Sequence, residues 1–178
     1  MASSPMRPRS SGLLPICLAL QLLLAGCGTG LFGEGDERLD DINAVPAWFE
    51  RHRGELEVVM RLLLPHQSIH RVWGAEPSSS QQYGKLSLED EAAYAGTFSI
   101  MERLSIAEVI VWRRDGKGPA FDFVLWRIGI AVSGRFTFLR YSEDRDERKA
   151  RLAYWDSTPN QVLHLGHPGW FAIRSSSD

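Results

Sequence analysis

A long stretch of alternating side chains near the middle of this 178-residue chain constrains the fold more than any other feature. Over residues 121–132, apolar side chains occupy both faces of an extended backbone, with every second residue from Phe121 on the same face. Ser133-Gly134 is suited to a tight turn, and residues 135–141 then alternate apolar and polar side chains. The pattern predicts an antiparallel hairpin in a sheet with one buried and one partly exposed face.

Two segments that precede this hairpin have helical spacing instead. Residues 45–64 repeat apolar side chains three and four positions apart, and Pro65 ends the pattern. A second helix is expected over residues 87–105, because Ser87 and Asp90 resemble a capping box and apolar residues follow at helical spacing. Both segments therefore predict helices with one buried face.

Shorter strand-like segments flank the hairpin. Residues 107–113 contain a β-branched and aromatic run, which favours a strand. Further candidates are residues 68–73, 162–165 and 170–173. We therefore predict an α+β fold in which two N-terminal helices pack on an antiparallel β-meander of about four to six strands. The domain is expected over residues 45–174, followed by a disordered tail over residues 175–178.

The N-terminus has the pattern of a secretory signal. Arg7 and Arg9 precede an almost entirely apolar run over residues 13–25. As a helix this run would span about 20 Å, which is shorter than the roughly 30 Å hydrocarbon core of a bilayer. The sequence therefore predicts export, and a membrane-spanning helix is disfavoured.

The apolar run ends at Leu24-Ala25-Gly26-Cys27, which resembles the lipobox of bacterial lipoproteins. The resemblance implies that residues 1–26 are a signal peptide and that Cys27 carries a diacylglyceryl group and further acyl chains such as palmitate. Because Gly28 rather than aspartate follows the cysteine, it also implies an outer-membrane protein facing the periplasm. The alternatives are an ordinary signal peptide with an accidental cysteine, and an uncleaved anchor.

The residues after Cys27 are rich in glycine. Four glycines fall within residues 28–36, where regular structure is costly. We expect residues 27–44 to be a flexible tether between lipid and domain.

Charge and cysteine content narrow the possible partners. The chain has 20 basic and 22 acidic residues. Cleavage of the signal segment would remove two arginines and no acidic residue, so the mature net charge would be 18 − 22 = −4. This balance argues against a nucleic-acid partner, which requires a basic patch. Of the two cysteines, Cys17 would leave with the signal peptide, so no disulfide can form within the mature domain.

The histidines form two close pairs in sequence. His66 and His70 are four residues apart, and His164 and His167 are three apart, so these four imidazoles are weak candidates for a zinc site. However, Pro65 has just ended a helix, and no cysteine or carboxylate completes a recognised ligand spacing. The alternative is that all four are ordinary surface or half-buried side chains.

Other catalytic signatures are missing from the sequence. There is no Gly-x-Ser-x-Gly motif, and Ser133-Gly134 is better explained as a turn. The acidic run over residues 89–91 fits a helix start, and the mixed charges of residues 142–151 fit a solvated loop. We predict no catalytic residue and no cofactor.

Six tryptophans are many for a chain of this length. We expect most of them in the core, because tryptophan buries a large area, and leave Trp73 open. Those assigned to the core are Trp48, Trp112, Trp126, Trp155 and Trp170. Exposed tryptophans would instead mark a binding surface.

Residues 128–134 and Gly169-Trp170-Phe171 are similar to segments of small uncharacterised envelope lipoproteins and immunity-like proteins. With the lipobox, this similarity implies a non-enzymatic binding or accessory module for a protein, cell-wall element or toxin. The alternatives are an envelope hydrolase or metal-dependent enzyme using the histidines, and a purely structural envelope component. A pocket joining histidines to acids would favour the enzyme, and an aromatic-lined surface the binder.

Overall fold

The structure is a computed structural model that describes residues 34–75, 85–113, 118–130, 133–144 and 160–177. The predicted signal peptide and Cys27 lie outside the described residues. Among the described helices, none is both long enough and apolar enough to cross a membrane.

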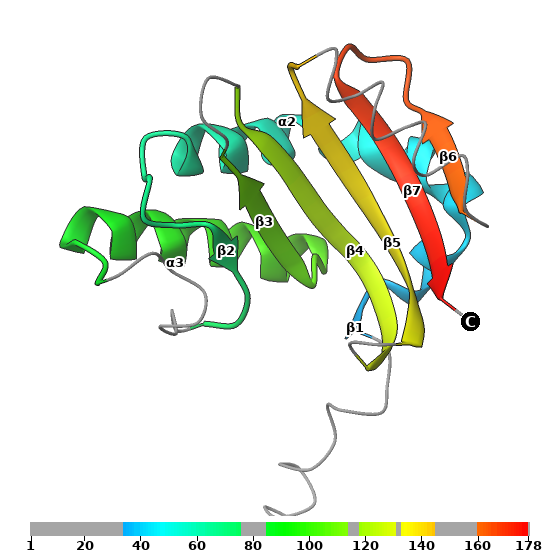
Figure 1. The fold of residues 1–178 in the computed structure, drawn as a ribbon, viewed down its shortest axis with the longest axis horizontal. Coiled ribbons are helices and arrows are strands. Elements are labelled where there is room, and N and C mark those ends of the chain that lie inside the picture. The colour runs from blue at the N-terminus through cyan, green and yellow to red at the C-terminus, as the bar shows by residue number, and fades with distance from the viewer. Residues whose placement is uncertain (1–33, 76–84, 114–117, 131–132, 145–159, 178) are drawn as a thin grey trace, which may run out of the picture. The chain divides into compact units, whose positions relative to one another are not determined.

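Two helices cover one face of an antiparallel sheet (Figure 1). The helices are α2 (Val45–Leu63) and α3 (Leu88–Leu104), and the 3-10 turns η1 (Glu37–Asp40) and η2 (Ile42–Ala44) precede them. The strands are β1 (Glu34–Gly35), β2 (Arg71–Val72), β3 (Glu108–Trp112), β4 (Ala120–Ile130), β5 (Ser133–Ser142), β6 (Gln161–His164) and β7 (Trp170–Ser177). Their order is β2-β3-β4-β5-β7-β6, and β1 pairs with β4. The predicted α+β class is confirmed.

The strand order differs from a simple meander. Strands β3, β4 and β5 follow one another, but β7 lies between β5 and β6. The reason is burial: Phe171, Ala172 and Ile173 of β7 are almost fully buried, whereas the four residues of β6 are exposed or half-buried and suit an edge. The short strand β1 precedes the helices, which the sequence pattern did not predict, whereas β2 lies between the helices and within the strand candidate at residues 68–73.

The helices lie within one residue of their predicted limits. In α2 the buried side chains recur at helical spacing, and they are Val45, Trp48, Phe49, Leu56, Val59, Met60 and Leu63. The predicted capping box of α3 is present: Ser87 Oγ accepts from the Asp90 backbone N–H, and Asp90 Oδ2 accepts from that of Ser87. Both helices share one apolar core with the sheet face that they cover.

The prediction of a flexible tether over residues 27–44 is wrong from Glu34 onward. Strand β1 pairs with β4, and the side chains of Leu39 and Ile42 are 2% and 4% exposed in the core. Asp36 and Asp41 cap the two 3-10 turns, which stabilises short turns despite the nearby glycines. The folded part therefore begins well before residue 45.

The predicted disordered tail over residues 175–178 is also wrong for residues 175–177. These serines continue β7, and Ser175 pairs with Phe136 of β5. A serine run has low strand propensity, but pairing with a long neighbouring strand satisfies its backbone. Of the four tail residues, Asp178 alone lies outside the described residues.

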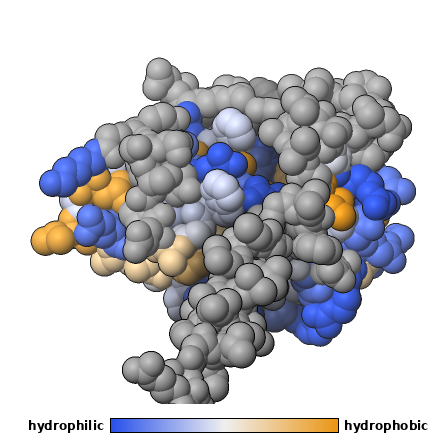
Figure 2. All heavy atoms as spheres, turned by 90° about the horizontal axis from the view of Figure 1, so that it is seen from below, coloured by the Kyte–Doolittle hydropathy of each residue, from blue (hydrophilic) through white to orange (hydrophobic). Residues whose placement is uncertain are grey.

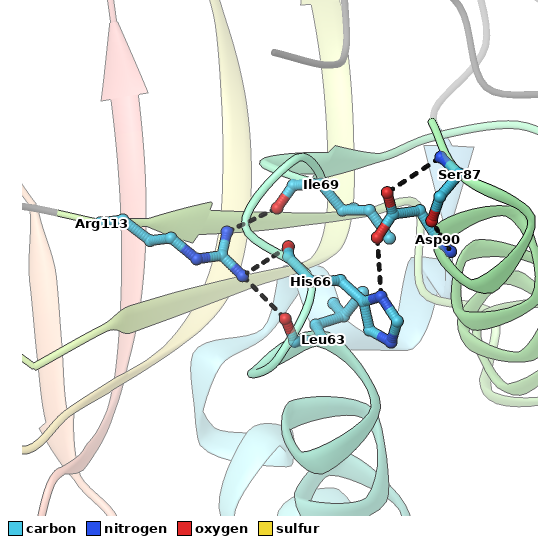
Figure 3. A network of polar contacts seen from close by, with 6 residues as sticks. All are labelled: Leu63, His66, Ile69, Ser87, Asp90 and Arg113. Carbon is cyan, nitrogen blue, oxygen red and sulfur yellow. Dashed lines mark hydrogen bonds and ion pairs between the residues drawn. The ribbon is translucent and has the colours of Figure 1, made fainter. Parts of the chain in front are cut away.

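Arg113 fixes the loop that follows α2 (Figure 3). Its guanidinium donates to the carbonyl oxygens of Leu63 (2.7 Å), His66 (3.0 Å) and Ile69 (2.5 Å). The carbonyls at a helix C-terminus lack partners within the helix, and a cation there also suits the helix dipole. A single side chain beyond β3 thus satisfies a carbonyl at the end of α2 and two carbonyls of the turn into β2.

Candidate functional site

The four candidate histidines do not form a metal centre in the structure. Within the described residues, no group of three or more His, Cys, Asp or Glu side chains is arranged to hold a metal ion. His66 lies in the loop after α2, His70 just before β2, His164 at the end of β6 and His167 in the turn before β7. The two pairs belong to separate segments, and neither pair gathers a third ligand.

His66 is half-buried and pairs with Asp90, with Nδ1 2.7 Å from Oδ1 (Figure 3). The Ser87 backbone N–H and then His66 hold the pKa of the Asp90 carboxyl below its usual value. The nearby Ser87 hydroxyl is engaged as the helix cap and accepts from the Asp90 backbone rather than bonding the histidine. This pair therefore links the loop to the start of α3 and does not resemble a catalytic dyad with a nucleophile.

His70 is half-buried beside Arg71 and Arg113. Burial, followed by the positive charges of these two arginines, lowers the pKa of His70. A neutral imidazole is favoured there, which suits a packed residue. By contrast, His164 is exposed on the edge strand β6.

His167 lines a groove of about 290 Å³. We call it the α2–β7 groove, because α2 forms one side and the turn before β7 the other. The ends of β4 and β5 complete it, at the upper end of the sheet in Figure 1. Its lining is Arg53, Glu57, Met60, Arg61, Leu64, Pro119, Phe121, Tyr141, Glu143, His167, Pro168 and Trp170.

A short chain of polar contacts joins the two sides of the groove. Arg53 Nη1 lies 3.0 Å from His167 Nδ1, and His167 Nε2 lies 2.9 Å from Glu50 Oε1. Because a guanidinium only donates, Nδ1 must accept and the imidazole proton must lie on Nε2, from which it is donated to Glu50. This arrangement holds the guanidinium of Arg53 in place.

Aromatic side chains form a second part of the lining, which we call the aromatic wall. Trp170 is buried, and its ring centroid lies 5.1 Å from that of Tyr141 and 5.0 Å from that of Phe49. The Tyr141 hydroxyl donates to Glu143 Oε1 at 3.0 Å. The wall is therefore rigid, with a polar rim, as in sites that bind by surface complementarity.

Arg61 adds an available cation at the rim of the groove. Its side chain is exposed and makes no hydrogen bond or ion pair with the part of the chain that the structure describes. The described lining contains no serine, threonine or cysteine that could serve as a nucleophile. Chemically, the groove can hold a partner that offers an apolar group to the aromatic wall and a carboxylate to Arg61.

The outer face of the sheet, away from the helices, carries two exposed tryptophans. Trp112 is 39% exposed, so its assignment to the core is wrong; its Nε1 donates to Asp122 at 2.7 Å. Trp73 is 44% exposed, with the guanidinium carbons of Arg71 and Arg127 at 5.7 and 5.2 Å from its ring.

The other tryptophans follow the prediction where the structure describes them. Trp48, Trp126 and Trp170 are buried, whereas Trp155 lies outside the described residues. Trp112 differs because its strand alternates, which directs its ring to the face without helices.

Of the groove lining, only His167 was singled out from the sequence as a candidate site residue, whereas Trp170 was expected in the core. Arg53, Glu57 and Arg61 were missed, although their spacing of four along α2 marks a charged stripe beside the apolar one. No local pattern indicates that Tyr141 and Glu143 belong to a groove. Tyr141 lies at the end of β5 and Glu143 directly after it, and the position of that end beside α2 depends on tertiary packing.

Comparisons with known proteins add no family assignment. No family model, no curated protein and no solved structure matches this chain.

Proposed function

We propose that this chain is an envelope lipoprotein, cut before Cys27 and held on a membrane by the lipid on that residue. The observation that carries the proposal is the lipobox-like Leu24-Ala25-Gly26-Cys27 at the end of an apolar run too short to span a bilayer. Two or three acyl chains would anchor the protein stably. With Gly28 after the cysteine, the proposed location is the outer membrane, facing the periplasm.

The proposed activity of the domain is non-enzymatic binding through the α2–β7 groove. The aromatic wall, an ordered Arg53 and an available Arg61 support binding. His167, Glu57 and Glu143 also line the groove, as the alternative enzyme would require, but the described lining contains no serine, threonine or cysteine. The partner would be a protein or a cell-wall element that presents an apolar group and a carboxylate. In this proposal α3 and the antiparallel strands are a scaffold that holds α2 against the strand ends.

The anchor is tested by labelling cells with radioactive palmitate. We expect label in the wild-type protein and none in Cys27→Ala, together with accumulation of the unprocessed form when lipoprotein signal peptidase is blocked. Equal labelling of the two proteins, or processing that ignores the block, would contradict the lipoprotein proposal.

The groove is tested by cross-linking in envelope preparations, with the detergent-solubilised full protein recovered through a C-terminal tag. Arg61→Glu reverses the cation at the groove rim and should abolish capture of the partner. Arg51→Glu is the matched control, because Arg51 is exposed on the same helix but outside the groove lining. Equal capture by both variants would exclude the groove as the binding surface.

A further inference from the structure

The attachment of the N-terminal segment to the sheet limits how the domain can stand on a membrane. Glu34 and Gly35 pair with Arg127 and Trp126 of β4, and the Asp36 backbone N–H donates to the carbonyl oxygen of Leu125 at 3.1 Å. Strand β3 pairs with β4 only as far as Val124, and β1 pairs with the residues of β4 that follow. The segment is therefore part of the sheet and not a linker.

Further contacts hold the same segment down. Leu39 and Ile42 are buried in the main core, and the Asp40 carboxylate lies 3.1 Å from Arg174 of β7 and 3.8 Å from Arg135 of β5. Releasing this segment would expose two apolar side chains and break these contacts. Any free chain between Cys27 and the domain therefore ends no later than Glu34.

Only residues 28–33 separate Cys27 from this attachment point. Fully extended, the seven steps from Cys27 to Glu34 span at most about 25 Å. A flexible glycine-rich chain of this length has a root-mean-square span of roughly 15 Å. A tether that extended to residue 45, as expected from the sequence, would have reached about 60 Å. Folding of residues 34–44 therefore shortens the remaining tether, called the leash below, by more than half.

The attachment point and the α2–β7 groove lie at opposite ends of β4. The groove is lined by Pro119 and Phe121 at the start of this strand, whereas β1 pairs at Trp126 and Arg127 (Figure 1). The seven steps from Pro119 to Trp126 span about 23 Å of extended strand. Turning the groove toward the bilayer would therefore require an almost fully stretched leash, which is entropically unfavourable.

The surface around the attachment point exposes both apolar and charged side chains. We call it the anchor end; its described members are Ile128, which is 37% exposed, and the exposed Arg38 and Arg135. Figure 2 views the molecule from this end and shows mostly hydrophilic residues among those described on the side of β7. Arg38 pairs with Asp36 and Arg135 lies near Asp40, so this surface is charge-compensated and the short leash, rather than charge, would keep it at the bilayer.

We propose that the lipid on Cys27 holds the domain end-on, with the anchor end against the headgroups and the α2–β7 groove directed away from the membrane. This inference rests on the proposed lipidation of Cys27 and assigns a lipid surface as the partner of the anchor end. It gives the groove a defined function, because a periplasmic partner could reach it without displacing the protein from the membrane.

The orientation is tested with the full lipidated protein in phosphatidylethanolamine–phosphatidylglycerol vesicles that contain a headgroup-nitroxide lipid. A fluorophore is attached at Ile128→Cys on the anchor end or at Pro168→Cys on the exposed turn beside the groove. Labelling is specific, because Cys17 leaves with the signal peptide and Cys27 is blocked by its thioether. We expect quenching to be several-fold stronger at position 128 than at position 168, with vesicles lacking nitroxide as the control.

Equal quenching at the two positions, or stronger quenching at position 168, would overturn the orientation. A second variant inserts twelve Gly/Ser residues between Gly30 and Leu31, and the quenching ratio should then fall toward one. A ratio that survives the insertion would contradict the leash as its cause. Mass spectrometry of the purified protein separates the two proposals: absence of acyl groups on Cys27 refutes both, whereas equal quenching of an acylated protein refutes only the orientation.

Discussion

Gly35 is the residue on which the pairing of β1 depends. Its φ is +101°, and a Cβ atom there would lie 2.1 Å from the carbonyl oxygen of Leu125. Gly35→Ala should therefore destabilise the domain by about 1–3 kcal/mol, through strain and the loss of β1 pairing. Gly54→Ala, where the added methyl meets nothing within 4 Å in α2, should instead stabilise it by about 1 kcal/mol. Urea unfolding of both variants checks this, and equal midpoints would contradict it.

Asp90 gives the domain a defined response to acid. The Ser87 backbone N–H and His66 lower the pKa of Asp90, so its stabilising effect is complete above the unfolded-state pKa of about 3.9 and is lost as pH falls through the lower folded-state value. Asp90→Asn keeps the cap acceptor but loses the charged contact with His66, so it should cost about 1 kcal/mol at pH 7. The difference from the wild type should shrink below pH 4, which urea titrations at several pH values measure; a constant difference would exclude this role.

The end of α2 is stabilised by Arg113 in addition to the local stop signal of Pro65. Arg113→Met would leave the carbonyl oxygens of Leu63, His66 and Ile69 without this donor, and should cost about 2–4 kcal/mol. Arg51→Met removes an exposed arginine that bonds only within α2, so it should change stability by less than about 0.5 kcal/mol. Thermal unfolding compares the two, and a small effect of Arg113→Met would show that water replaces the guanidinium.

The elements differ in how far the sequence predicts them. Helix α2 was predictable because its buried side chains and Pro65 are local signals, and the same holds for the capping box of α3. The position of β7 between β5 and β6 was not, because it depends on which distant strand buries Phe171 and Ile173. The groove was missed for the same reason, since its lining comes from α2 and three separate strand ends.

At the scale of the whole molecule, the N-terminal boundary is where local and tertiary signals conflict most. The glycines of residues 28–35 favour a flexible chain, yet Leu39 and Ile42 can be buried only against the sheet. Burial of these two side chains outweighs the cost of ordering a short segment that Asp36 and Asp41 help to cap. The same segment both completes the core and shortens the leash.

The boundary can be tested by truncation. A protein that begins at Glu34 keeps β1 and both 3-10 turns, whereas one that begins at Val45 loses the buried Leu39 and Ile42. Each fully buried aliphatic side chain contributes about 1.5–3 kcal/mol, so the shorter protein should be about 3–6 kcal/mol less stable. That loss is a large fraction of the roughly 5–15 kcal/mol typical of a domain, so its Tm should fall steeply or its unfolding lose cooperativity. Calorimetry of the two proteins decides: equal Tm values would return residues 34–44 to the tether and lengthen the leash on which the end-on orientation depends.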